Sequence, residues 1–215
     1  MKVVMLGNDT KEEIEKRLQI VASAGNLSRA DGTVTQVFES NNDYDKNLKL
    51  ARAVVGYGHK SIAEHDYIVF ALEDVTPIVE QTIIGYRLTS FTIKSRRNVD
   101  FRNVGFYVPD FHDKDGNVLK NNKALQKKYK DYMQSLFDKY GELVDEEIPV
   151  EDCRYILPYC YHSNIIMGCD ANELLRITSD MLHGKISHIP EVKELGEKFA
   201  EMIREKAPYL VRALD

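Results

Sequence analysis

One stretch of the chain, IIGYRLTSFTIKSRR (residues 83–97), combines residue types that bind phosphate. Its residues of interest are Arg87, Ser90, Ser95, Arg96 and Arg97. Arginine offers a rigid fork of N–H donors that matches phosphate oxygens, and a serine hydroxyl or a loop amide can fill the remaining directions. The same composition also fits a solvated basic connector whose serines cap turns. Spacing alone does not decide between an anion-binding loop and such a connector.

A second polar stretch, GHKSIAEH (residues 58–65), contains residue types that could bind a metal or start a helix. His59, Glu64 and His65 are metal-ligating types, but their spacing lacks the helical histidine pair of known zinc sites. Ser61, with Glu64 three positions later, has the spacing of a helix N-cap and its partner. We therefore expect a helix capped by Ser61, and no metal site.

A third candidate is Arg154, in the segment VEDCRYILP. An arginine on the polar side of a short helix is usually solvated. Arg154 gains a functional meaning if the fold brings it to Ser95 and Arg97, because a phosphate would then be held by residues distant in sequence.

The three cysteines, Cys153, Cys160 and Cys169, form no C-x-x-C pair, and any disulfide scheme within the chain leaves one over. This usage favours a reducing, cytoplasmic setting. The segment PYCYH around Cys160 has some likeness to a nucleophilic-cysteine site, but a reactive thiolate needs a nearby base or positive charge. We expect ordinary buried thiols.

The composition limits the classes of partner. A net charge of -5 argues against general binding to nucleic acid or to a membrane surface, so an anion site has to be a local cluster. No apolar run approaches the roughly 20 residues that cross a bilayer. The first residues turn polar too soon for a signal peptide. We expect a single domain over residues 1–215.

Hydrophobic patterns predict strands interleaved with helices early in the chain and helices later, which is typical of the α+β class. Strands are expected over residues 2–6, 33–39, 66–74 and 101–109. Helices are expected from Thr10, over about 43–56, from Thr76 and Pro77, and over 122–143, 150–157, 171–183 and 190–206. The Ser/Arg-rich stretch is expected as a loop.

Taken in order, these segments resemble the flavin-dependent thymidylate synthases. The signature of that family, R-H-R-x-x-S-x-x-x-x-S-x-R, follows a helix. Here Arg87 stands at its third arginine, Ser90 and Ser95 at its serines, and Arg97 at its last arginine. GHKSIAEH resembles the family's G-H-x-[ST]-x-x-E-H segment, CRYILP its R-x-x-L-P, and DANELL stands where the family has N-A-R-x-L. The resemblance covers nearly the whole chain.

The resemblance implies an antiparallel or mixed sheet flanked by helices, and roles for particular residues. Arg87, Ser95, Arg97 and Arg154 match positions that hold or neighbour the phosphate of dUMP. Ser61, Glu64, Arg87, Asp170 and Asn172 match positions near the flavin. The implied cofactor is FAD, and the implied reaction is methylation of dUMP to dTMP with methylenetetrahydrofolate and NADPH. The resemblance further implies a homotetramer with sites formed between subunits, and no nucleic-acid or membrane partner.

The chain also departs from the family pattern. Gly85 and Tyr86 replace an arginine and a histidine, Thr92 and Ile93 an asparagine and a glutamate, Asp170 and Asn172 an asparagine and an arginine, and Met181 an arginine expected to hold the pyrimidine ring. Glycine and tyrosine do not stabilise a flavin's negative charge as arginine and histidine do. Each missing hydrogen-bond partner costs about 1–3 kcal/mol.

These departures leave alternatives to dUMP methylation open. One is a diverged paralogue that keeps the phosphate cradle and acts as a regulatory or partner subunit. Another is an enzyme acting on a different nucleotide, in which Asp170, Asn172 and Arg176 read another base. Fold alone does not choose among them, because function lies in the site.

Overall fold

The computed structural model describes residues 1–214, which divide into two compact units. The first unit comprises Met1–Leu72, Gln81–Thr92 and the chain from Ile166 onward. The second unit comprises Glu73–Glu80 and Ile93–Ile165. The single domain expected over residues 1–215 stays a prediction.

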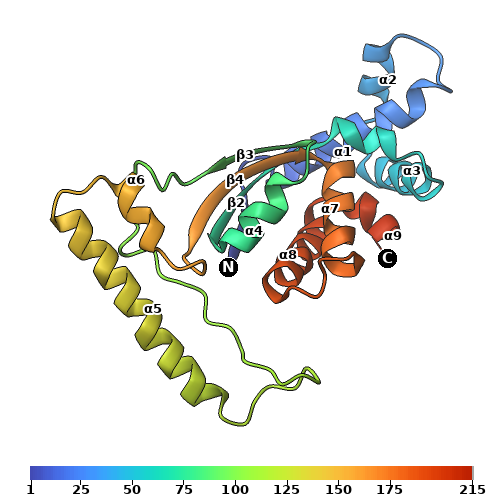
Figure 1. Cartoon of the computed structure of the whole chain (residues 1–215). Coiled ribbons are helices and arrows are strands. Elements are labelled where there is room, and N and C mark those ends of the chain that lie inside the picture. Colours follow the sequence, from blue (N-terminus) through green and yellow to red (C-terminus); the bar gives the residue numbers. More distant parts are fainter. Residues whose placement is uncertain (215) are drawn as a thin grey trace. The chain divides into compact units, whose positions relative to one another are not determined.

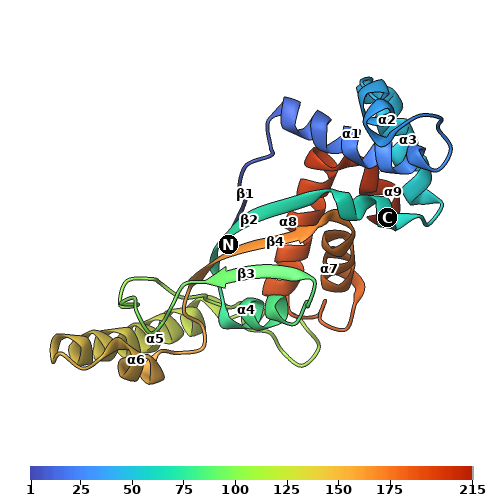
Figure 2. The same cartoon turned by 90° about the horizontal axis from the view of Figure 1, so that it is seen from above.

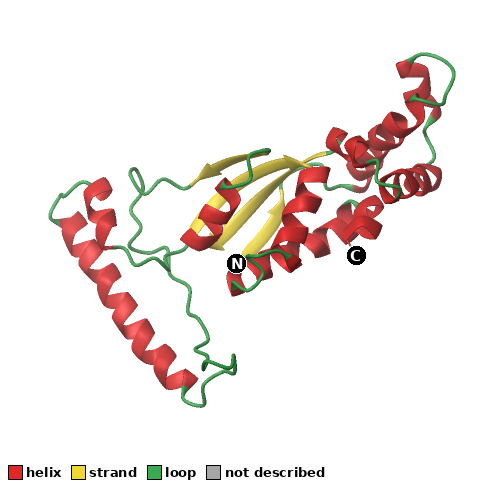
Figure 3. Cartoon of the chain, turned by 45° about the vertical axis from the view of Figure 1, so that its right-hand side comes forward, coloured by secondary structure: helices red, strands yellow, loops and turns green. Residues whose placement is uncertain are grey.

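A four-stranded antiparallel sheet flanked by helices forms the centre of the fold, which confirms the predicted α+β class (Figure 3). Its strand order is β1 (Lys2–Met5), β2 (Tyr67–Val75), β4 (Ser163–Asp170) and β3 (Thr89–Ile93). At one end of the central pair the Ala171 amide donates to the Asp66 carbonyl (2.8 Å), and at the other the Asp74 amide donates to Asn164 Oδ1 (3.2 Å). These contacts fix the antiparallel register of β2 and β4.

Helices α7 (Ala171–His183) and α8 (Pro190–Lys206) cover one face of the sheet (Figure 1). Ile68, Phe70 and Leu72 alternate along β2 toward this side and are buried, as expected for a strand with one covered face. The rings of Phe70 and Phe199 lie 5.2 Å apart. A Cβ on Gly196 would lie only 2.8 Å from that of Met181, so α7 and α8 approach closely at this glycine.

The remaining elements of the first unit precede and follow this layer. They are α1 (Lys11–Leu27), α2 (Val34–Ser40), α3 (Tyr44–Gly56), the 3-10 helix η1 (Lys60–His65), the 3-10 helix η3 (Pro208–Leu210) and α9 (Val211–Leu214). Helix α4 (Pro77–Ile84) starts in the second unit and ends in the first. None of the described helices is long and apolar enough to cross a bilayer.

A buried ion pair connects these elements. Arg17 of α1 donates to both oxygens of Asp66 (2.7 and 3.2 Å), and the Tyr209 hydroxyl donates to Asp66 Oδ2 (2.7 Å). Arg17 also donates to the carbonyl oxygens of Asn8 (2.7 Å) and Lys206 (3.1 Å). All of these side chains are buried. Every oxygen of the carboxylate therefore has a partner, which buried charge requires.

The second unit packs around one long helix. Helix α5 (Asn122–Asp145) is followed by α6 (Val150–Cys153) and the 3-10 helix η2 (Arg154–Ile156), and α6 lies beside α5 in both views (Figures 1 and 2). Its buried core consists of Phe101, Phe137, Tyr140, Cys153 and Tyr161. The Tyr140 hydroxyl accepts from the Phe101 amide (3.1 Å), so the loop before α5 is tied to the helix.

Several predicted elements are confirmed. Thr10 and Glu13 form the reciprocal capping box at the start of α1. Helices α7 and α8 have the predicted bounds, and β1, β2, α3, α4 and α5 lie where they were expected within a few residues.

The strand predicted over residues 33–39 is wrong, because this segment is helix α2. Gln36 donates its amide to the Thr33 hydroxyl (3.4 Å), and its side chain accepts from the Thr33 amide (2.8 Å). This second capping box outweighs the alternation of apolar and polar residues.

The prediction that Ser61 caps a helix is wrong, although a helix is present there. The residue before η1 is His59, because the chain turns at Gly58 with a φ of +95°.

The predicted strand over residues 101–109, all in the described chain, is also wrong. Phe106 makes an isolated bridge with Tyr161 and stacks on Phe137 of α5 (centroids 5.5 Å apart). Gly105, at φ +77°, breaks the alternation. The expected loop over residues 87–97 contains strand β3, since TSFTI is rich in β-branched and aromatic residues. Strand β4 was not predicted.

We predict that Asp66→Asn lowers the free energy of unfolding by about 3–5 kcal/mol, because Arg17 is then left buried without its counter-charge. Tyr209→Phe removes one hydrogen bond and is expected to cost about 1–2 kcal/mol. Denaturant unfolding, followed by circular dichroism, measures both.

Lys11→Ala provides the control, since Lys11 pairs with Glu15 across 3.8 Å on the exposed side of α1. Its effect should be within experimental error. A smaller loss for Asp66→Asn than for Tyr209→Phe would contradict the importance given to the ion pair.

Candidate functional site

A short loop after β3 carries two of the predicted phosphate ligands. Ser95 Oγ accepts from the Arg97 amide (3.2 Å), and the Ser95 carbonyl accepts from the Val99 amide (3.1 Å), so residues 95–99 form a closed turn. The Arg97 side chain is 66% exposed, and its Nε donates to Glu151 Oε2 (2.9 Å). We call residues 94–99 the serine–arginine loop.

The third predicted phosphate ligand lies on the segment that this loop contacts. Glu151 is in the first turn of α6, and Arg154 follows three residues later where α6 passes into η2. The Arg154 guanidinium lies 5.3 Å from the centroid of the Tyr155 ring, and Tyr155 is 81% exposed. The contact between Arg97 and Glu151 therefore joins the loop to the segment that carries Arg154, within the second unit.

The electrostatics of this region suit an anion. Arg97 has one carboxylate partner, Glu151, and that pair is exposed on both sides. An exposed ion pair is weak and exchanges partners easily. A phosphate dianion presents more oxygens and more charge than one carboxylate, so it can compete with Glu151 for the fork of Arg97. Sequence reasoning missed Glu151, although its position one helical turn before Arg154 was a signal.

The predicted flavin-binding residues belong to the first unit. Asn172 Nδ2 donates to Glu64 Oε1 (3.2 Å), and Asp170 caps α7 by accepting from the Glu173 amide (2.8 Å). Burial raises the pKa of Asp170, the Glu173 amide works in the opposite direction, and the charge of Glu64 adds to the rise. Glu64, Asp170 and Asn172 thus gather where η1 meets the start of α7.

Two further candidates in the first unit are exposed. Ser61 lies on the outside of η1, and Arg87 lies in the turn between α4 and β3. Arg87 is thus in the first unit, whereas Ser95, Arg97 and Arg154 are in the second. The structure brings Glu64 and Asn172 into contact, and joins Ser95 and Arg97 to the helix of Arg154.

Tyr86, which stands in place of the signature histidine, is buried against α7. The Arg176 guanidinium lies 5.1 Å above its ring, and Arg176 itself bonds to Glu173 (2.6 Å) and lies 3.6 Å from Asp180. Burial, with a smaller effect of the Asp180 charge, raises the pKa of Tyr86 to about 12. Met181 is fully buried at the contact of α7 with α8. Neither side chain is placed to donate to an anionic ligand.

The residues present fit FAD in part by their chemistry. FAD presents a pyrophosphate, several hydroxyl groups and an adenine amine. Arg87 offers a cation for the pyrophosphate, while Glu64, Asp170 and Asn172 offer acceptors for hydroxyl and amine groups. Gly85 and Tyr86 add no cation. The match to FAD is therefore partial, with Arg87 as the cation kept at the signature.

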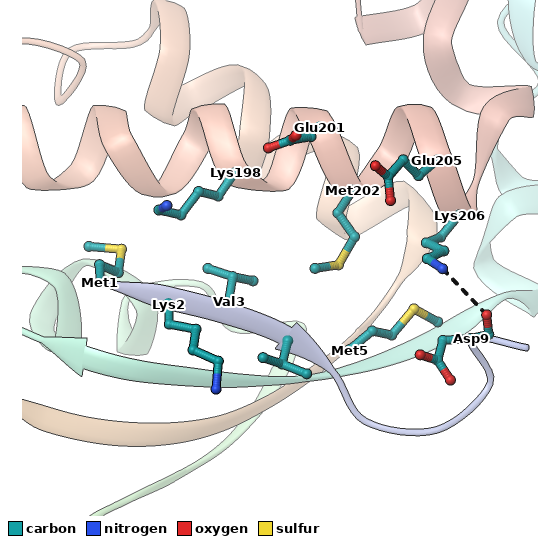
Figure 4. Close-up of a pocket in the computed structure, with 11 residues that line it drawn as sticks. Met1, Lys2, Val3, Met5, Asp9, Lys198, Glu201, Met202, Glu205 and Lys206 are labelled. Carbon is teal, nitrogen blue, oxygen red and sulfur yellow. Dashed lines mark hydrogen bonds between the residues drawn. The ribbon is translucent and has the colours of Figure 1, made fainter.

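Besides the predicted site residues, the described chain contains surface hollows and buried thiols. No cluster of three or more His, Cys, Asp or Glu side chains among residues 1–214 could hold a metal ion. A hollow between β1 and α8 is lined by methionines and mixed charges, and Lys206 there donates to the Asp9 carbonyl (3.4 Å) (Figure 4). Its lining contains no predicted site residue. Cys153 and Cys169 are buried, and burial raises the pKa of Cys169 to about 12.

Comparison with known proteins identifies the family of the chain. Residues 11–209 match the sequence family described as "Thymidylate synthase complementing protein". A flavin-dependent thymidylate synthase of Thermococcus onnurineus is 31% identical over 175 residues, which are 80% of this chain and 66% of that protein. One of Geobacter sulfurreducens is 27% identical over 214 residues, which are 99% of this chain and 86% of that protein. The chain thus spans about two thirds of the first relative's length.

A solved structure shows the same fold. The UMP/dUMP methylase PolB from Streptomyces cacaoi, bound with 5-Br dUMP, superposes with a TM-score of 0.74 at 20% identity, and the match covers 99% of this chain and 93% of that one. With the fold, the order of the motifs and the match over residues 11–209 in agreement, this chain belongs to the flavin-dependent thymidylate synthase family.

Proposed function

We propose that this chain binds the 5′-phosphate of dUMP, or of a related nucleotide, at the serine–arginine loop. The observation that carries the proposal is the contact of Arg97 with Glu151, which joins Ser95 and Arg97 to the segment of Arg154. Two guanidinium groups and a hydroxyl are the donors that a phosphate monoester requires. Family membership supports a nucleotide as the ligand.

The reaction that best fits this site is methylation of dUMP to dTMP with FAD, methylenetetrahydrofolate and NADPH. When bound, FAD supplies the redox chemistry. The chain's own residues bind and orient: Arg97 and Arg154 hold the phosphate, and Arg87 holds the charged part of the cofactor. Catalysis in such a site is mainly positioning and electrostatics.

A second candidate function is supported by Tyr86 and Met181. Tyr86 is buried at the histidine position of the family signature, and Met181 is buried at the later position where an arginine is expected to hold the pyrimidine ring. Arg176 is already paired with Glu173 and Asp180. A paralogue that binds a nucleotide phosphate without methylating dUMP, as a regulatory or partner subunit or as an enzyme for another nucleotide, fits these observations. The cytoplasmic location inferred from cysteine usage stays a prediction.

We predict that Arg97→Ala and Arg154→Ala each weaken dUMP binding about 10- to 100-fold, because each removes a charge-assisted bond to the phosphate. Isothermal titration calorimetry measures the affinity. Arg102→Ala is the matched control, since Arg102 lies in the same unit and pairs with Asp100 and Asp145 instead. Unchanged affinity in both test variants would refute the phosphate assignment.

Glu151→Gln should change the affinity for dUMP in the opposite direction to Arg97→Ala. Its carboxylate competes with the phosphate for Arg97, so removing the charge is expected to strengthen dUMP binding several-fold. A weaker affinity in this variant would mean that Glu151 holds Arg97 in place rather than competing with the ligand.

We predict that the purified protein binds added FAD and that Arg87→Ala weakens this binding about tenfold or more, because Arg87 is the cation kept at the signature. Visible flavin absorbance after gel filtration measures the binding. Arg29→Ala, an exposed arginine of the same unit, is the control. A wild-type protein that binds dUMP but shows no flavin absorbance would rule out the first candidate and leave the second.

We also propose a homotetramer that uses the uncovered face of the sheet. In Figure 2 the strands lie in front of α8, and no described helix of the first unit covers their near face. Tyr67 (48% exposed) and Ile166 (52% exposed) point to this side. Exposed apolar residues on a sheet face are typical of a protein contact.

If this face joins subunits, Ile166→Asp should shift the protein from the tetramer to a smaller species, because a charge is then buried at the contact. Analytical ultracentrifugation measures the mass. Val34→Asp, at an exposed site on α2, is the control and should leave the mass unchanged. A tetramer that persists in Ile166→Asp would place the contact elsewhere.

A further inference from the structure

Arg96 lies between Ser95 and Arg97 but is held by different partners. Its Nη1 donates to Glu80 Oε2 (2.7 Å) and also contacts the Tyr161 hydroxyl, while its guanidinium lies 5.2 Å from the centroid of the Tyr161 ring. The Arg96 side chain is 34% exposed, against 66% for Arg97. Two adjacent arginines of one loop are therefore directed to different surroundings.

The charge of Arg96 is already neutralised. The Glu80 side chain is 5% exposed, and its Oε1 has no hydrogen-bond partner among the described residues. A carboxylate buried in this way depends on its cation, because a buried charge without a counter-charge is strongly unfavourable. Arg96 and Glu80 thus form a neutral unit, so the other cations of the loop are the exposed Arg97 and the half-buried Lys94.

The backbone on both sides of Arg96 is also fixed. The Lys94 amide donates to the Asn164 carbonyl (2.9 Å), and the Val99 amide donates to the Ser95 carbonyl (3.1 Å). Lys94 Nζ lies 5.6 Å from the centroid of the Phe101 ring. Between these two backbone contacts, the side chain of Arg96 anchors the middle of the loop to Glu80 and Tyr161. All of these groups belong to the second unit.

We propose that Arg96 is a positioning residue: anchored by Glu80 and Tyr161, it holds Ser95 and Arg97 in the geometry that binds a phosphate monoester dianion. This inference rests on the proposed function of the serine–arginine loop. A loop that is ordered before the ligand arrives loses less conformational entropy on binding, so its affinity is higher. Arg96 itself does not contact the phosphate.

The double variant Arg96→Met/Glu80→Gln tests the proposal. It leaves the net charge unchanged and leaves no buried charge unpaired, so the second unit is expected to fold. Titration with dUMP, and separately with inorganic phosphate, should show about tenfold weaker binding than wild type. Hydrogen–deuterium exchange should become faster at the amides of residues 95–99, while exchange in α5 stays the same.

Lys127→Met/Asp131→Asn is the matched control, since it removes a neutral ion pair on the exposed side of α5 in the same unit (2.9 Å). Arg96→Lys, which keeps the charge but not the planar fork, is a milder second variant and should weaken dUMP binding about threefold. The control variant and Arg96→Lys should each leave the melting temperature near that of the wild type.

The outcomes separate this inference from the proposed function. Wild-type affinity in Arg96→Met/Glu80→Gln, together with weak binding in Arg97→Ala, overturns the role of Arg96 and leaves the phosphate site standing. Wild-type affinity in Arg97→Ala and Arg154→Ala overturns the phosphate site itself. Weaker binding with unchanged exchange at residues 95–99 also overturns the positioning role, because Arg96 would then act on the ligand directly.

Discussion

The buried carboxylate of Asp66 is the interaction on which the first unit depends. Its side chain accepts from Arg17 of α1 and Tyr209 of η3, and its backbone carbonyl accepts from Ala171, where β4 ends and α7 begins. Through Arg17 the same network reaches the end of α8 at Lys206. Removing two charges from water is costly, and the cost is offset here because both side-chain oxygens of the carboxylate are hydrogen-bonded.

The position of this network bears on the candidate cofactor residues. Glu64 lies two residues before Asp66, and Asp170 and Asn172 flank Ala171, whose amide bonds to Asp66. The ion pair of Asp66 with Arg17 therefore stabilises the backbone next to these predicted cofactor residues. In the second unit Glu80 anchors the serine–arginine loop in a comparable way, but its Oε1 has no hydrogen-bond partner within residues 1–214. A buried group that is only half satisfied depends more strongly on its single cation.

Much of the fold follows from signals that are local in sequence. The capping box at Thr10, the proline at the start of α8 and the stripe of apolar residues along α5 each fix an element by contacts within a few residues. Residues 33–39 and 101–109 were wrongly predicted as strands. Alternation of apolar and polar residues is typical of a strand, but it also occurs where the apolar residues of a helix or loop pack on separate neighbours. At residues 33–39 the capping box of Thr33 and Gln36 decides for a helix. At residues 101–109 the turn at Gly105 and the contacts of Phe101 and Phe106 with the second unit's core decide against a strand.

In the candidate site, too, some features follow from local sequence and others depend on contacts between distant residues. Ser95, Arg97 and Arg154 were predicted from their chemistry and from the family signature, and their role in phosphate binding stays a prediction. The pairing of Arg97 with Glu151 and of Arg96 with Glu80 depends on contacts between residues 54 and 16 positions apart. Spacing carries no information about such pairs, so sequence could not distinguish the anchored arginine from the exposed one. Strand β3 was not predicted, because the serines and arginines around it are typical of a polar loop, although TSFTI itself is rich in β-branched and aromatic residues.

The two halves of the signature, residues 85–87 and residues 95–97, differ in how their side chains are paired and buried. The serine–arginine half keeps an exposed cation with a weak carboxylate partner, which an incoming anion can displace. In the other half Tyr86 has become part of the packing against α7, and the nearby Arg176 is neutralised by Glu173 and Asp180. A compensated arginine cannot replace the positive charge that the signature has lost at residues 85 and 86. The proposed phosphate ligands and the altered signature positions belong to different units, so the two proposed binding activities are tested by separate measurements.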